Sequence, residues 1–148
     1  MNAQEYAGLI EDHLNSCQFL EDPPHFTTKI KIFTHPFPDS FFWEDDVIRL
    51  KDDLCLKVED SARFRGDAMF NRNFSYDLRH CTTGRLIWRI CNHGTWKPVS
   101  EPCHVHVNPD NEDERLAFFE DSRTTIFPYV MHCLKNHYTG KPQDWEVK

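Results

Sequence analysis

The alternation of apolar and polar positions along the chain predicts a helix, a series of strands and a second helix. Residues 4–20 place apolar side chains three and four positions apart, which is the spacing of one face of an amphipathic helix. Pro23 and Pro24 follow, and because proline disfavours helical geometry in the preceding residue, we expect the helix to end before them. Residues 26–34 then alternate as a half-buried strand does. A loop containing two prolines is expected over residues 35–46.

Two hairpins are predicted in the middle of the chain. Residues 47–50 and 54–58 are mainly apolar runs on either side of the polar segment Lys51–Asp53, a pattern typical of two strands joined by a turn. Residues 73–80 and 85–91 alternate more strictly, with a Thr-Thr-Gly turn between them. We therefore expect this second pair to place apolar side chains on one face of a sheet and mainly polar side chains and cysteine on the other.

The end of the chain predicts one more strand and a closing helix. A short strand is expected at residues 103–107, followed by an acidic surface loop at 108–114. A helix should begin near residues 122–126, since Pro128 fits a helix only in its first turn. The whole pattern indicates a single α+β domain over residues 1–148. A meandering antiparallel sheet of about six strands would pack with an N-terminal and a C-terminal helix.

Composition agrees with one folded domain. The chain has 148 residues, of which 39% are hydrophobic and twelve are phenylalanine, so we expect a phenylalanine-rich core. The N-terminus has no basic start followed by an apolar run, and no stretch reaches the length of a membrane span, so we expect a soluble, cytoplasmic protein. The six cysteines contain no CxxC motif, so we expect them to remain thiols rather than to form a zinc ribbon or a redox motif.

Charge is distributed unevenly along the chain. The net charge of −7 argues against non-specific binding of nucleic acid by the whole surface. Residues 61–100 reverse this sign, because they carry seven basic and two acidic side chains between two acidic blocks. This block predicts a local anion-binding site, while the alternative is that its arginines alternate along strands and face solvent.

The positive block overlaps residues 75–106, which hold four of the nine histidines and three of the six cysteines. Histidine can exchange a proton or bind a metal near neutral pH. Because side chains two apart in a strand share a face, Cys91 should lie beside His93, and His104 beside His106. If the two segments pair, these four side chains form a candidate zinc site.

The same histidines also permit metal-free acid–base chemistry. One can take a proton from a ribose 2′-hydroxyl, another can give one to the leaving oxygen, and an arginine can stabilise the phosphate. The candidate catalytic residues are His93, His104, His106 and Arg89, and the candidate substrate-binding residues are Arg85, Arg79, Trp96, Asn92 and Lys97. Other interpretations stay open, namely ordinary hydrogen bonds for the histidines, a cap on the core for Trp96 and a nucleophilic role for Cys91.

Four short motifs carry a resemblance to a known family. Lys51–Glu59 resembles a run D-G-s-x-L-x-v-x-E, and Phe74–Tyr76 resembles Y-S-Y. Gly84–His93 resembles G-r-L-i-x-R-x-D-N-x-x-H, and Pro102–His106 resembles P-x-H-x-H. In order and spacing, over residues 45–138, the chain resembles the TumE-like toxins of prokaryotic toxin–antitoxin pairs.

The resemblance implies a toxin that inhibits translation and is neutralised by a helix-turn-helix antitoxin encoded beside it. An activity on RNA, such as that of a metal-independent ribonuclease, agrees with the positive block and the histidines. The expected partners are the antitoxin and RNA, with no membrane and with a homodimer as an open alternative. Cys91 stands where the family usually carries aspartate, so an acidic role is either lost or taken elsewhere in this chain.

Two competing functions remain open at this point. One is a non-enzymatic interaction module that binds a partner through a sheet edge or through an exposed aromatic segment, Phe41–Trp43. The other is a small zinc-binding domain built on Cys91, His93, His104 and His106.

Overall fold

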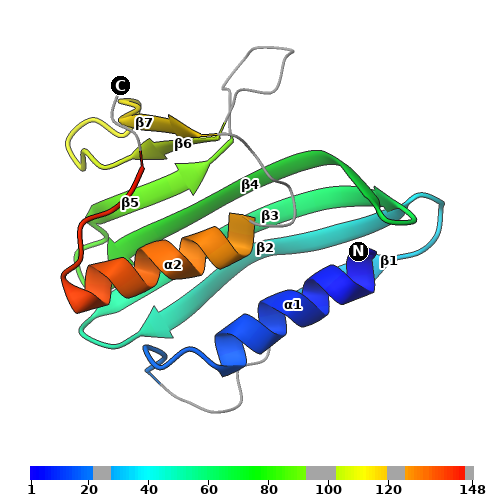
Figure 1. Cartoon of the computed structure of the whole chain (residues 1–148), viewed down its shortest axis with the longest axis horizontal. Coiled ribbons are helices and arrows are strands. Elements are labelled where there is room, and N and C mark those ends of the chain that lie inside the picture. The colour runs from blue at the N-terminus through cyan, green and yellow to red at the C-terminus, as the bar shows by residue number, and fades with distance from the viewer. Residues whose placement is uncertain (22–27, 93–102, 120–125, 146–148) are drawn as a thin grey trace.

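The structure is a computed structural model that describes residues 1–21, 28–92, 103–119 and 126–145. Along the chain a helix comes first, a series of strands follows and a second helix comes last, which confirms the predicted α+β class (Figure 1). The elements are α1 (Ala3–Asn15), β1 (Lys31–Phe33), β2 (Asp39–Leu50), β3 (Leu54–Arg65), β4 (Ala68–His80), β5 (Leu86–Cys91), β6 (Cys103–His106), β7 (Ala117–Phe119) and α2 (Ile126–Thr139).

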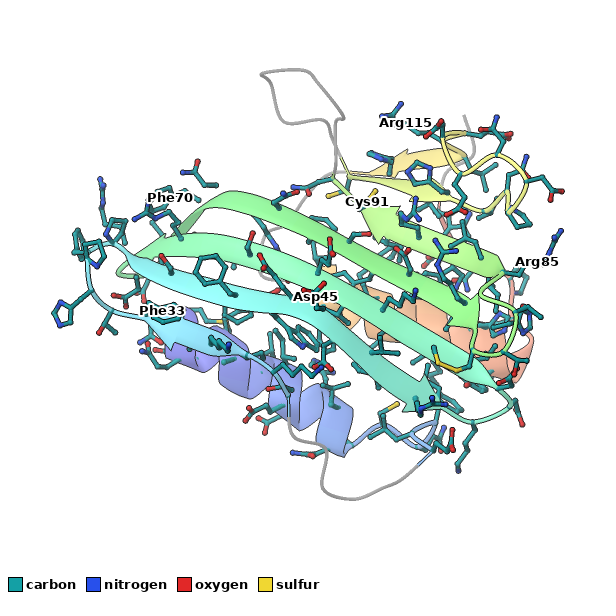
Figure 2. The ribbon with its side chains drawn as sticks, turned by 180° about the vertical axis from the view of Figure 1, so that it is seen from behind. Phe33, Asp45, Phe70, Arg85, Cys91 and Arg115 are labelled. Carbon is teal, nitrogen blue, oxygen red and sulfur yellow. A yellow bond between two sulfur atoms is a disulfide. The ribbon has the colours of Figure 1, made fainter. Side chains whose placement is uncertain are left out.

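The strands form one antiparallel sheet in the order β1-β2-β3-β4-β5-β6-β7, so each strand pairs with its neighbours in the sequence. This is the predicted meander, with β7 as an additional short strand. Figure 1 shows α1 and α2 on the same face of the sheet, and in the view from behind in Figure 2 no helix of the described residues covers the opposite face. One face of the sheet therefore belongs to the core, and the other is available for a site.

The core lies between the sheet and the two helices. Trp43 of β2 packs against Phe127 of α2 with ring centroids 5.5 Å apart, and it meets Tyr76 of β4 edge-on at 6.1 Å. Each large apolar side chain removed from water contributes about 1.5–3 kcal/mol, so this layer supplies most of the driving force for folding. The largest fully buried side chains are Trp43, Trp88, Tyr6, Tyr76, Phe41, Phe64, Phe74 and Phe127.

The start of β2 differs from the prediction. Residues 39–46, expected as part of a loop, belong to this strand, and a register shift lies between Trp43 and Asp46. Asp45 has a φ of 54°, and Asp46 accepts a hydrogen bond of 2.8 Å from the Trp43 indole. A bulge adds one residue to a strand and breaks its two-residue period, which is why the pattern did not predict a strand there.

The same strand corrects the prediction of an exposed aromatic segment. Phe41 and Trp43 are fully buried in the core, whereas Phe42 between them is 37% exposed. Successive side chains of a strand point to opposite faces, so three consecutive aromatic residues cannot form one exposed surface here. The prediction that Phe41–Trp43 forms an exposed segment for partner binding is therefore wrong for Phe41 and Trp43.

A disulfide closes the end of the β3–β4 hairpin. Cys55 at the start of β3 and Cys81 just after β4 are bonded, with their Cα atoms 5.2 Å apart. The expectation that all six cysteines remain thiols is wrong for this pair. Their separation of 26 residues hid the pairing, because only the antiparallel register brings them together.

Neither helix in the described part of the chain is long and apolar enough for a membrane span. Both are amphipathic and pack on the sheet through one face, as the sequence pattern predicted for residues 4–20 and for the C-terminal helix. Pro128 occupies the first turn of α2, where its missing N–H has no helical partner to lose.

A buried ion pair ties α1 to the sheet. Asp60 of β3 is 1% exposed and accepts a hydrogen bond of 2.8 Å from the guanidinium of Arg72 in β4. The Tyr6 hydroxyl of α1 also donates to this carboxylate at 3.2 Å, and Tyr76 of β4 donates to it as well. Burial raises the pKa of both tyrosines, so they remain neutral donors to the carboxylate.

Replacing Asp60 by alanine should therefore lower the free energy of unfolding by about 3–5 kcal/mol, because it leaves the Arg72 charge buried without its carboxylate. Urea denaturation measures this change. Asp67→Ala is the matched control, since Asp67 pairs with the N-terminal amine at the surface and its side chain is 81% exposed. The control should change the unfolding free energy by less than about 1 kcal/mol. Equal losses in the two variants would contradict a structural role for the buried pair.

Candidate functional site

A pocket of about 740 Å³ opens on the face of the sheet that carries no helix. Figure 2 shows Cys91 and Arg115 on this side of the molecule. The walls come from β3, β4, β5, β6 and the segment that follows β6. The lining residues are Lys57, Glu59, Ser75, Asp77, Arg89, Cys91, His106, Glu112, Asp113 and Arg115.

Strand register places the polar side chains of this face in two rows. Antiparallel pairing sets β3 against β4, β4 against β5 and β5 against β6, so outward side chains at paired positions become neighbours. One row consists of Lys57, Asp77, Arg89 and His106, and the other of Glu59, Ser75, Cys91 and His104. Residues from four strands thus meet because each strand alternates and each pairs with its neighbour.

Cys91, His104 and His106 form a cluster at the β5–β6 end of these rows. The Cys91 Sγ lies 3.3 Å from Nε2 of His104, and the two imidazole rings meet edge-on with centroids 4.8 Å apart. One candidate ligand atom from each of the three residues lies within 4.8 Å of the others, and all three residues are buried. The predicted meeting of these three side chains is confirmed, while His93 lies outside the described residues.

His106 is held as a neutral imidazole. Burial, together with the nearby His104 and Arg89, lowers its pKa to about 4. Its Nδ1 atom is buried and has no hydrogen-bond partner in the part of the chain that the structure describes. A neutral imidazole can accept a proton or bind a metal, but it is not poised to donate a proton at neutral pH.

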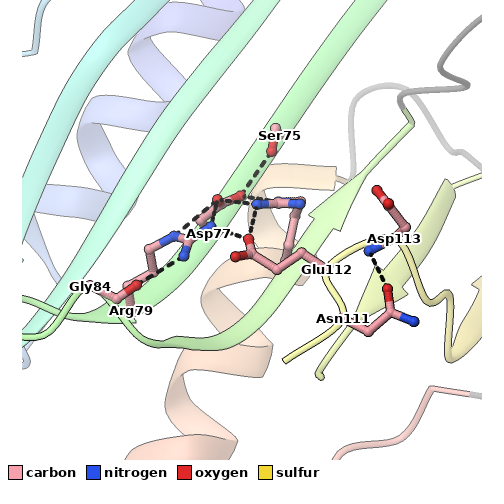
Figure 3. Close-up of polar contacts among 8 residues, drawn as sticks. Ser75, Asp77, Arg79, Gly84, Asn111, Glu112 and Asp113 are labelled. Carbon is pink, nitrogen blue, oxygen red and sulfur yellow. Dashed lines mark hydrogen bonds and ion pairs between the residues drawn. The ribbon is translucent and has the colours of Figure 1, made fainter. Parts of the chain in front are cut away.

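An ion-pair network occupies the next part of the pocket (Figure 3). Asp77 accepts hydrogen bonds from Arg89 at 2.9 and 3.1 Å and from Arg79 at 3.1 and 3.3 Å. Glu112 accepts from the same two arginines at 2.8 and 2.6 Å. Burial by itself raises the pKa of Asp77, but hydrogen bonds from Arg89, Ser75 and Arg79 outweigh it and lower that pKa. The two carboxylates are therefore charged and hold both guanidiniums.

The remaining candidates from the sequence do not join the cluster. Arg85 has a side chain 58% exposed and pairs with Asp110 at 3.5 Å. Asn92 accepts a hydrogen bond from the Phe74 N–H and donates one to the Arg72 carbonyl, both at 2.9 Å, so its amide links β4 to the end of β5. Trp96 and Lys97, which were expected to contact substrate, lie outside the described residues.

Sequence reasoning missed the pocket residues that come from distant segments. Lys57 and Glu59 alternate with the buried side chains of β3, so the sequence pattern could predict which face of the sheet they take. It could not predict that they lie on the same face as the histidines of β6, because that depends on the order of the strands in the sheet. Ser75 and Asp77 alternate in the same way on β4. Glu112 belongs to a segment that the sequence marked only as an acidic loop, and no local signal connected it to the arginines.

Comparisons with protein-family models, with curated proteins and with solved structures found no significant match to this chain.

Acid should destabilise the protein through His106. The unfolded chain protonates this histidine near pH 6.5, whereas the folded protein does so only near pH 4. Between these values the unfolded state binds more protons, so the free energy of unfolding falls as the pH is lowered. Relative to a His106→Gln variant, the wild-type protein should lose up to about 3 kcal/mol between pH 7 and pH 4. Urea denaturation with a chelator present measures the difference, and parallel pH curves for the two proteins would contradict it.

Proposed function

We propose that this protein is a toxin that cleaves RNA in the pocket, with a zinc ion held by Cys91, His104 and His106. The observation that carries the proposal is the convergence of a thiol and two imidazoles in one buried cluster, of which Cys91 and His106 line the pocket. Nitrogen and sulfur donors of this kind are the ligands that zinc prefers in proteins.

The spacing of the donor atoms supports a metal site. Zinc bonds of 2.0–2.3 Å in a tetrahedral site put the ligand atoms about 3.3–3.6 Å from one another. The Cys91 Sγ and the His104 Nε2 are 3.3 Å apart, and no pair in the cluster exceeds 4.8 Å. The candidate ligand atoms thus lie near the spacing of a zinc site, and the buried Nδ1 atom of His106 has no hydrogen-bond partner among the described residues.

Within the described residues the cluster offers three protein ligands, the number typical of a catalytic zinc, which keeps a fourth position for water. Cys91 and His106 both line the pocket, so that position can face a substrate. Zinc lowers the pKa of its water to about 7 and so supplies hydroxide near neutral pH. Held by Cys91, His104 and His106, the ion would supply this hydroxide for attack on the phosphorus of an RNA linkage, with the bond to the leaving oxygen breaking and that oxygen taking a proton from solvent.

Three basic side chains of the pocket offer contacts for a phosphate-containing substrate. Lys57, Arg89 and Arg115 line its walls, together with the acidic side chains of Glu59, Asp77, Glu112 and Asp113. Cations placed where negative charge develops on a phosphate stabilise the transition state of its cleavage. The toxin assignment, and a helix-turn-helix antitoxin as the partner, are supported by the motifs of residues 45–138 that resemble the TumE-like family.

The direct test incubates the purified protein with total RNA and with tRNA, after metal removal and after addition of one equivalent of Zn²⁺. We expect cleavage only with zinc, since the metal supplies the attacking hydroxide. Cys91→Ser should lose more than about tenfold in zinc affinity and most of the activity, because the thiolate is one of three ligands. Cobalt substitution provides a second readout, because a thiolate–cobalt charge-transfer band should be present in the wild type and absent in Cys91→Ser.

Cys17→Ser is the matched control, since Cys17 is a thiol on the opposite side of the sheet and outside the pocket. It should keep both the cobalt band and the cleavage. Full cleavage by the metal-free protein would reject the zinc site in favour of proton transfer by the histidines alone. Zinc binding without cleavage of any RNA would reject the enzymatic proposal.

A further inference from the structure

Two arginines of the pocket converge on a single carboxylate oxygen. Nη2 of Arg79 lies 2.6 Å from Oε1 of Glu112, and Nη2 of Arg89 lies 2.8 Å from the same atom. The arginines come from neighbouring strands, β4 and β5, whereas Glu112 comes from the segment after β6 (Figure 3). Guanidinium groups that meet on one anionic oxygen are the arrangement that proteins use to bind phosphate.

Asp77 fixes the two guanidiniums independently of Glu112. It accepts two hydrogen bonds from each arginine, and it sits between them on the sheet with 8% of its surface exposed. The arginines therefore keep their positions when Glu112 leaves. Two positive charges and one negative charge then remain, so the site without Glu112 attracts an anion.

Glu112 is the replaceable member of the network. Its side chain is 40% exposed, whereas the side chains of Arg79 and Asp77 are 13% and 11% exposed. A partly exposed ion pair contributes little to stability, so little free energy opposes its exchange for another anion. A phosphate group offers more acceptor oxygens than the single carboxylate oxygen that now bridges the arginines.

We infer that Arg79 and Arg89 form a phosphate-binding subsite, and that Glu112 occupies it until a phosphate of the substrate displaces this carboxylate. The assignment of that phosphate to RNA rests on the proposed function. Arg89 pairs directly with His106 in the strand register, so a phosphate held here lies beside the Cys91–His104–His106 cluster. The subsite thus positions the RNA strand so that the linkage to be cut lies next to the cluster. Glu112 competes with the RNA phosphate for the two arginines.

The test measures binding of inorganic phosphate and of a short 2′-O-methyl RNA to the full chain by calorimetry, with a chelator present. Glu112→Gln should tighten binding of both probes at least fivefold, because the competing charge is gone while the side chain keeps its size. Asp113→Asn is the matched control, since Asp113 lines the same pocket but has no ion pair with the two arginines. Asp113→Asn should change the affinity for either probe by no more than about twofold, as expected of a general change in pocket charge.

The double variant Arg79→Gln/Glu112→Gln should not show the tighter binding expected of Glu112→Gln, because one of the two guanidiniums that bind the phosphate is missing. Equal tightening in Glu112→Gln and Asp113→Asn would overturn the subsite, as would unchanged phosphate binding in Glu112→Gln. Tightening with inorganic phosphate alone would overturn the assignment to RNA and identify a site for free phosphate. Since a chelator is present throughout, failure of the zinc-dependent cleavage leaves these outcomes unaffected.

Discussion

The antiparallel register of β3, β4, β5 and β6 is the constraint on which the rest of this protein depends. It stacks the apolar side chains of each strand against α1 and α2, and it collects the polar ones in two rows on the other face. A shift of one residue in any of these strands would exchange the two faces and bury charged groups without partners. The apolar packing that stabilises this register therefore also fixes the positions of the pocket residues.

The polar face divides into two regions with different chemistry. At one end, a thiol and two imidazoles lie together in a buried cluster, and the neutral state of His106 suits metal binding or proton acceptance. Beside it, Arg79, Arg89, Asp77 and Glu112 form a nearly neutral network with charge held in a fixed pattern. Four arginines of the positive block, Arg72, Arg79, Arg85 and Arg89, are thus paired with acidic side chains, some of which lie outside the block.

Much of this arrangement was predictable from local pattern. Strict alternation in residues 73–80 and 85–91 placed Asp77, Arg89 and Cys91 on the polar face, and the His-x-His spacing placed His104 beside His106. Long-range effects were not predictable. The bulge at Asp45 concealed the start of β2, the disulfide joins cysteines whose spacing carries no motif, and Glu112 reaches the arginines only through the path of the chain after β6. Local periodicity reports which face a side chain takes, but not which distant segment lies over it.

Cys91 has a consequence for which ion this face can select. A carboxylate at this position would be a hard ligand that suits magnesium or manganese. Sulfur is soft and polarizable, so a thiolate beside two imidazoles discriminates against those abundant hard cations and favours zinc or copper(I). A site built on Cys91, His104 and His106 at the β5–β6 end of this face would therefore bind soft cations in preference to hard ones.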